Sequence, residues 1–87
     1  MFSLSRDVTV TDVETGVVLL DGRRGRYWRL NHSGAAVLRS LLEGKSPAET
    51  ADQLRGDAAI PVEQALHDVT ATIDLLRKAR LLSVGVR

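Results

Sequence analysis

The chain has 87 residues, with 12 basic and 11 acidic side chains and a net charge of +1 at pH 7. This length makes one domain with a small core, over residues 1–87. The absence of cysteine excludes disulfides, thiolate metal sites and a cysteine nucleophile, and it is typical of a reducing compartment. Because no signal-peptide pattern or bilayer-length apolar run occurs, we expect a cytoplasmic protein.

The first half of the sequence predicts a three-stranded antiparallel meander. Val8–Val13 alternates apolar and polar residues, as a half-buried strand does. After a turn at Gly16 comes Val17–Leu20, which is apolar on both faces and is therefore expected in the centre of the sheet. A second glycine-containing turn, at residues 21–25, returns the chain as a third strand, Arg26–Leu30.

The third strand is the most informative segment. Alternation places Tyr27 and Arg29 on one face of the sheet and Trp28 and Leu30 on the other. In a meander this strand is an edge, and an edge strand presents unpaired N–H and C=O groups to any extended chain that approaches.

Two capped helices are predicted next. Asn31 is a favourable N-cap for a helix over Ser33–Glu43, and Gly44 follows at the position where a C′ glycine is common. Ser46–Glu49 has the sequence of a capping box with proline at the first helical position. We expect the second helix to stop at Gly56.

A third helix is predicted from Pro61 to about Ala79. Its apolar stripe consists of Val62, Leu66, Val69, Ile73 and Leu76. A short apolar tail is expected to fold back onto the body and consists of Leu81, Leu82, Val84 and Val86. The predicted class is α+β and winged helix-turn-helix-like, with a three-stranded antiparallel β-meander followed by three α-helices.

Catalytic chemistry has no support in the sequence. The histidines are His32, beside a helix cap, and His67, on the third helix, and neither has an evident orienting partner. No histidine or carboxylate spacing suggests a metal site. We therefore predict a protein that is not an enzyme and that needs no cofactor or metal.

DNA binding is an alternative that the winged-helix outline leaves open. The start of the third helix carries Glu63 and Asp68, and the helix has no lysine or arginine before Arg77, so this start repels phosphate. A basic wing tip is the feature that favours DNA, and it consists of Arg23, Arg24 and Arg26. We rank DNA binding below peptide binding and expect neither a nucleic-acid nor a membrane partner.

Peptide binding fits better, because an extended segment can add to the edge of the third strand. The strand would contribute Arg26, Tyr27, Trp28, Arg29 and Leu30. On the third helix, Leu66, Val69 and Ile73 would form an apolar floor, and Thr70, Asp74 and Arg77 a polar lip.

Two alternatives to this assignment of the third helix stay open. The floor residues can simply be core, and the groove can lie on the opposite flank, near Ala65, Asp68 and Thr72.

The sequence resembles the PqqD-like family of leader-peptide-binding domains, the recognition elements of ribosomal peptide (RiPP) modification pathways. The resemblance runs from Val17 to Leu82 and rests on Tyr27–Asn31, Leu41–Gly44, Ser46–Ala51, Asp68–Val69, Leu75–Leu76 and Leu81–Leu82. It implies binding of a precursor's leader as an added strand between the third strand and the third helix.

The resemblance also implies partners. The chain looks most like the stand-alone recognition domains of lasso peptide biosynthesis, which work with a leader-cleaving cysteine protease and an asparagine-synthetase-like cyclase. A chaperone for a radical enzyme in quinone cofactor synthesis is the near alternative, and a winged-helix DNA-binding regulator is the more distant one.

Overall fold

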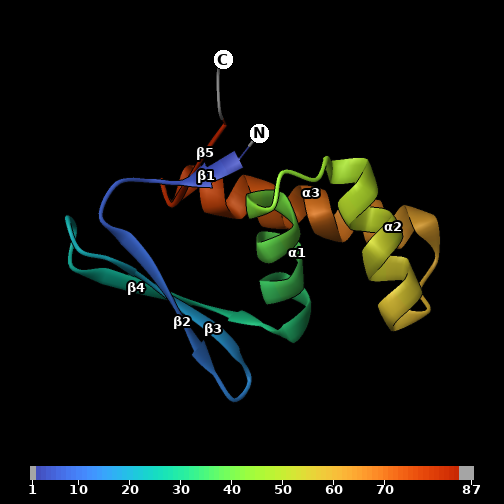
Figure 1. Cartoon of the computed structure of the whole chain (residues 1–87), viewed down its shortest axis with the longest axis horizontal. Coiled ribbons are helices and arrows are strands. Elements are labelled where there is room, and N and C mark those ends of the chain that lie inside the picture. Colours follow the sequence, from blue (N-terminus) through green and yellow to red (C-terminus); the bar gives the residue numbers. More distant parts are fainter. Residues whose placement is uncertain (1, 85–87) are drawn as a thin grey trace.

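The computed structural model describes residues 2–84 and arranges them as two small sheets and three helices (Figure 1). In chain order the elements are β1 (Phe2–Leu4), β2 (Val8–Val13), β3 (Gly16–Asp21), β4 (Arg26–Asn31), α1 (His32–Leu42), α2 (Pro47–Ala58), α3 (Val62–Lys78) and β5 (Leu82–Val84). The predicted α+β class is confirmed.

The meander is the larger sheet, with strand order β2-β3-β4 and antiparallel pairing throughout. Its centre is β3, as the apolar character of Val17–Leu20 predicted. In the register, Leu19 lies opposite Val10 on one side and Trp28 on the other. Side chains from all three strands therefore meet on the face that the helices cover.

The direction of the main-chain groups on β3 follows from the bond between the Gly22 N–H and the Asp7 carbonyl, at 2.9 Å. This bond continues the β2–β3 ladder by one pair. Because direction alternates along a strand, Leu20, two residues before Gly22, also points its N–H and C=O toward β2. Leu19 points its groups toward β4.

The second sheet was not predicted. β1 pairs with β5 in antiparallel register, with Ser3 opposite Ser83, so the two ends of the described chain lie side by side (Figure 1). Three-residue strands are too short to show alternation in sequence. The prediction that the apolar tail folds back is confirmed for Leu81 and Leu82, which are buried; Val86 lies outside the described residues.

The predicted N-terminal caps of α1 and α2 are confirmed, and α1 and α3 start within one residue of the predicted Ser33 and Pro61. The Asn31 side chain accepts a hydrogen bond from the Gly34 N–H at 2.9 Å. In α2 the Ser46 hydroxyl accepts from the Glu49 N–H at 3.1 Å, while the Glu49 carboxylate accepts from the Ser46 N–H at 2.9 Å. The predicted stop at Gly56 is wrong, since α2 continues to Ala58 and ends at Ala59 in the left-handed conformation.

The stripe predicted for α3 is partly wrong. Val69, Ile73 and Leu76 are buried, but Val62 and Leu66 are 44% and 42% exposed. Ala65 is fully buried in their place. Leu66 and Ala65, three and four residues before Val69, lie on opposite sides of it around the helix axis. The small Ala65 faces the core, and Leu66 does not.

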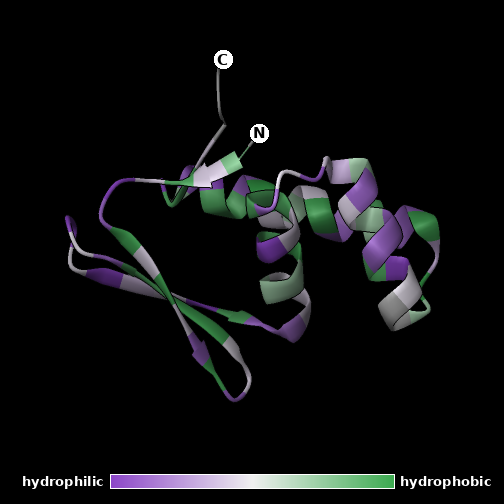
Figure 2. Cartoon of the chain, in the orientation of Figure 1, coloured by the Kyte–Doolittle hydropathy of each residue, from purple (hydrophilic) through white to green (hydrophobic). Residues whose placement is uncertain are grey.

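The core lies between the sheet and the helices. Its largest fully buried side chains come from β3, α1, α3 and the segment before β5, and include Leu19, Leu38, Leu41, Leu76 and Leu81. Burial of each leucine contributes about 1.5–3 kcal/mol. Figure 2 shows green, hydrophobic stretches along β3, whereas α2 is mostly purple and white.

Candidate peptide-binding site

The edge of β4 carries main-chain groups that face away from the sheet. Trp28 lies opposite Leu19 and directs its N–H and C=O toward β3. Tyr27 and Arg29, one residue to each side, therefore direct theirs outward. Among the described residues β4 has no second neighbour in the sheet. This is the unpaired edge that the meander predicted.

The side chains of β4 divide as the sequence analysis expected. Tyr27 is 69% exposed and Arg29 is exposed, while Trp28 is half-buried and Leu30 is 9% exposed. Trp28 and Leu30 thus face the helices, and Arg26 lies over the Trp28 ring, 5.9 Å from its centroid. The Trp28 indole N–H is buried and has no acceptor within residues 2–84.

A hollow of about 460 Å³ opens where the end of β4, the start of α1 and the middle of α3 meet. One residue of α2 completes it. Its lining consists of Arg29, Leu30, Asn31, Ser33, Gly34, Val37, Leu54, His67, Asp68, Ala71 and Thr72. The hollow therefore adjoins the unpaired edge of β4.

Local structure at the strand-to-helix switch shapes this hollow. The Asn31 cap starts α1 directly after β4, so the first turn of α1 folds against Leu30. A Cβ at Gly34 would lie 3.2 Å from the Leu30 Cβ. Glycine at this position lets the helix start lie close to the strand.

The hollow lies on one flank of α3. At 100° per residue, Asp68 and Thr72 lie on one side of the buried Val69, and Thr70 and Asp74 lie on the other. Thr70, Asp74 and Arg77, predicted as the polar lip, do not line the hollow. Asp68 and Thr72 do, and they belong to the flank that the sequence analysis named as the alternative.

The residues predicted to form the apolar floor differ in their exposure to solvent. Val69 and Ile73 belong to the core, with exposures of 0% and 8%, and Leu66 is exposed. His67, Ala71 and the first turn of α1 were missed. They have no distinctive sequence signal, because only the packing of α3 against α1, with β4 across the hollow, brings them together.

The polar groups of the hollow leave one acidic side chain available. The Thr72 hydroxyl donates to the Asp68 carbonyl within α3, at 2.8 Å. The Asp68 carboxylate forms no ion pair or side-chain hydrogen bond with any other described residue. It can therefore accept hydrogen bonds from a ligand.

The hairpin tip next to β4 is held by Asp21, which is 1% exposed. Its carboxylate accepts from the Arg23 and Arg24 N–H groups, at 3.0 and 3.3 Å, and from the Arg24 guanidinium at 3.1 Å. Burial by itself raises the pKa of Asp21, but these hydrogen bonds outweigh burial, and the pKa lies below its usual value. The turn is thus fixed by a charged group.

Residues 2–84 contain no group of histidine and carboxylate side chains that could hold a metal ion. None of the described helices is long and apolar enough to cross a membrane. The geometry provides main-chain hydrogen bonds along an edge, a half-buried aromatic ring and a hollow with one carboxylate. Such an arrangement can hold an extended polypeptide.

The fold and the site define a winged helix-turn-helix-like α+β domain with an open sheet edge beside a hollow. The family model described as Coenzyme PQQ synthesis protein D (PqqD) matches residues 16–82. The chain therefore belongs to the PqqD family. A search of curated proteins finds no match.

Two solved structures resemble the whole fold. One, described as lasso peptide synthetase B1 complexed with the leader peptide, has 34% sequence identity and a TM-score of 0.89, and the match covers 95% of this chain and 98% of that one. The other, TbiB1 in complex with the TbiA(beta) leader peptide, has 25% identity and a TM-score of 0.85, covering 98% and 99%.

Proposed function

We propose that this protein binds the leader segment of a ribosomally made precursor peptide by strand addition to β4. The leader would pair with the outward N–H and C=O groups of Tyr27 and Arg29. Its side chains would enter the hollow between β4 and α3. The observation that carries the proposal is the unpaired edge of β4 directly beside this hollow.

The pathway follows from the relatives. Both similar structures are of proteins bound to leader peptides, and one is described as lasso peptide synthetase B1. We therefore propose lasso peptide biosynthesis, with a leader-cleaving cysteine protease and an asparagine-synthetase-like cyclase as partners. The protein itself has no catalytic step. It raises the local concentration of precursor at the partner enzyme.

Hydrogen exchange tests the strand addition. The probe is the leader peptide of a candidate precursor, sought among the genes that neighbour the gene of this chain. On adding it, we expect the Tyr27 and Arg29 amides to exchange more slowly, because they gain partners, while α2 stays unchanged. If the new protection appears on β2 instead, the peptide uses the other edge of the sheet.

The choice of flank on α3 is tested by matched substitutions. Ala71→Phe places a ring in the hollow, and we expect leader affinity to fall about fivefold or more because overpacking excludes the peptide. Thr70→Phe, on the exposed opposite flank, should change affinity less than about twofold. Both are measured by fluorescence anisotropy, with melting temperatures as a folding check. The reverse result would assign the leader to the flank of Thr70, Asp74 and Arg77.

A further inference from the structure

Basic side chains gather at one end of the molecule, where three segments distant in sequence meet. The Gly22 N–H bonds the Asp7 carbonyl, and the Ser5 N–H bonds the Leu81 carbonyl, each at 2.9 Å. These bonds join the β3–β4 hairpin, the β1–β2 turn and the end of α3 (Figure 1). We call this surface the basic end. Its residues are Arg6, Arg23, Arg24, Arg26, Lys78 and Arg80.

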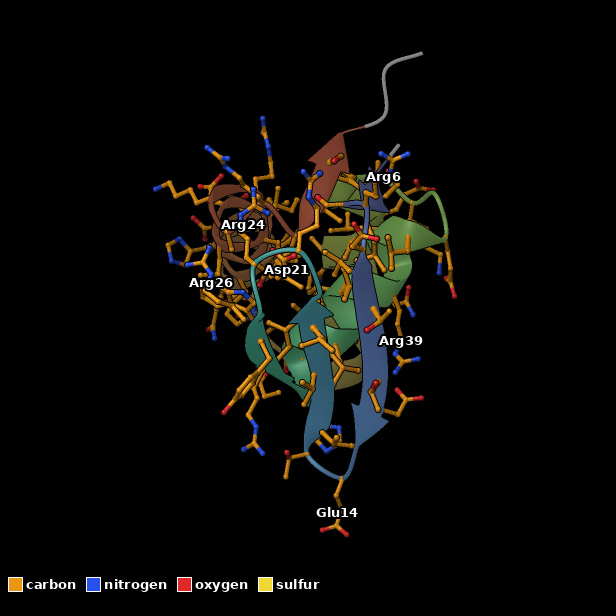
Figure 3. The ribbon with its side chains drawn as sticks, turned by 90° about the vertical axis from the view of Figure 1, so that its left-hand side faces the viewer. Arg6, Glu14, Asp21, Arg24, Arg26 and Arg39 are labelled. Atoms are coloured by element: carbon orange, nitrogen blue, oxygen red, sulfur yellow. The ribbon has the colours of Figure 1, made fainter. Side chains whose placement is uncertain are left out.

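The charge of the basic end is compensated only in part, by the buried Asp21 and by Asp7 of the β1–β2 turn. All of its side chains are exposed, and Figure 3 shows Arg6, Arg24 and Arg26 around the buried Asp21. Arg24 pairs with Asp21. The other basic-end residues form no ion pair with any residue between 2 and 84. Exposed cations that repel one another without a partner favour an anionic ligand.

The basic end is also one end of the candidate peptide site. β4 runs from Arg26, at the basic end, to Asn31, at the hollow, and these five steps span about 17 Å. On α3, Lys78 and Asp68 are separated by ten residues, or about 15 Å. The two sides of the site thus have matching lengths. On α3 the charge changes from Asp68 in the hollow to Lys78 at the basic end, whereas β4 carries Arg26 at the basic end and Arg29 at the hollow.

The hollow-facing flank of α3 extends to the basic end. From Asp68, spacings of three, four and three residues lead through Ala71 and Leu75 to Lys78, which keeps all four on one side of the helix. Leu75 is 47% exposed, so this flank offers an apolar contact between its two charged ends. A peptide lying along β4 would pass over that contact.

We propose that the site is electrostatically polarised and takes a peptide that carries aspartate or glutamate residues over the basic end. This rests on the proposed leader binding and adds the chemistry of the ligand. The acidic segment is separated by about five residues from the part that enters the hollow. Guanidinium and ammonium groups of Arg26 and Lys78 pair with its carboxylates.

Nucleic acid would also be attracted by these cations, but the rest of the site disfavours it. Asp68 lies in the hollow and Glu63 in the first turn of α3. A phosphate backbone following the groove would be repelled by the Asp68 carboxylate, and it cannot form the main-chain hydrogen bonds that the unpaired edge of β4 offers to a peptide. An acidic peptide is therefore the occupant that the edge of β4 and the basic end together favour.

The test begins with a selection of random displayed peptides on the full chain. We expect enriched peptides that slow amide exchange on β4 and carry aspartate or glutamate at one end. For one such peptide, the double variant Arg26→Gln and Lys78→Gln should lower affinity about tenfold. The matched control, Lys45→Gln and Arg55→Gln, removes two exposed charges outside the groove and should have little effect.

Changing the peptide instead of the protein tests the same charge pairing without any effect on the folding of the domain. Replacing its carboxylates with amides should lower affinity by a similar factor, and the salt dependence of binding should weaken in both cases. Selected peptides without acidic residues, or an unchanged affinity in the double variant, would overturn the polarised site and leave leader binding standing. A selection that yields no peptide protecting β4 would instead overturn leader binding. Duplex DNA that binds tighter than the peptides would assign the basic end to nucleic acid.

Discussion

The substitution Arg29→Pro is expected to weaken leader binding by about tenfold or more while the domain stays folded. Arg29 directs its N–H away from β3, so proline removes no bond of the β3–β4 ladder. It removes a donor that the leader would use. The proline ring also occupies the space into which that N–H points, which prevents a strand from approaching to the usual spacing of about 4.8 Å.

The matched control places proline on the opposite edge of the same sheet. Asp12 lies on β2 at an outward-facing position, and its exposed carboxylate pairs with Arg39 of α1. Asp12→Pro should therefore lower stability modestly and leave leader affinity unchanged. Affinity is measured by calorimetry and folding by thermal melting. Equal losses of affinity in both variants would mean that the proline effect is not specific to β4.

The largest loss of stability is expected for Gly16→Ala. Gly16 has φ +146°, and a Cβ there would lie 2.0 Å from the Leu30 carbonyl oxygen, closer than any real contact. The backbone of β4 would have to move away from β3 at the strand-to-helix switch. We expect the free energy of unfolding to fall by about 3 kcal/mol or more, a large part of the 5–15 kcal/mol typical of a domain.

Gly25→Ala is the control that separates two costs to stability, the steric clash of a Cβ and the positive φ. Gly25 also has a positive φ, +65°, but a Cβ there meets nothing within 4 Å. Its cost is therefore the left-handed conformation alone, about 1–2 kcal/mol. Urea unfolding of both variants gives the comparison. Similar losses at the two glycines would contradict the close approach of β3 and β4 near Leu30.

These substitutions act on two properties of one strand. Arg29→Pro tests the outer edge of β4, where the peptide would bind, and Gly16→Ala tests its inner edge, which holds the strand against β3. If both results are as expected, the groove depends on a rigid β4 whose position is fixed by the sheet and by the Asn31 cap of α1.

The elements whose signals are local could be predicted from the sequence. The Asn31 cap and the Ser46–Glu49 capping box involve groups three residues apart, and both form as predicted. The meander and the inward side of Trp28 and Leu30 follow from two-residue alternation, which operates within a single strand. The unpaired edge of β4 followed from these patterns.

Contacts between remote segments could not be predicted from local patterns, because they depend on how the elements pack. The pairing of β1 with β5 joins opposite ends of the chain through strands of three residues. The flank of α3 that borders the hollow depends on a rotation of the helix that buries Ala65 and exposes Leu66. A helix with apolar residues three and four positions apart permits either rotation, and the choice is made by the surfaces of α1, α2 and β5 against which α3 packs.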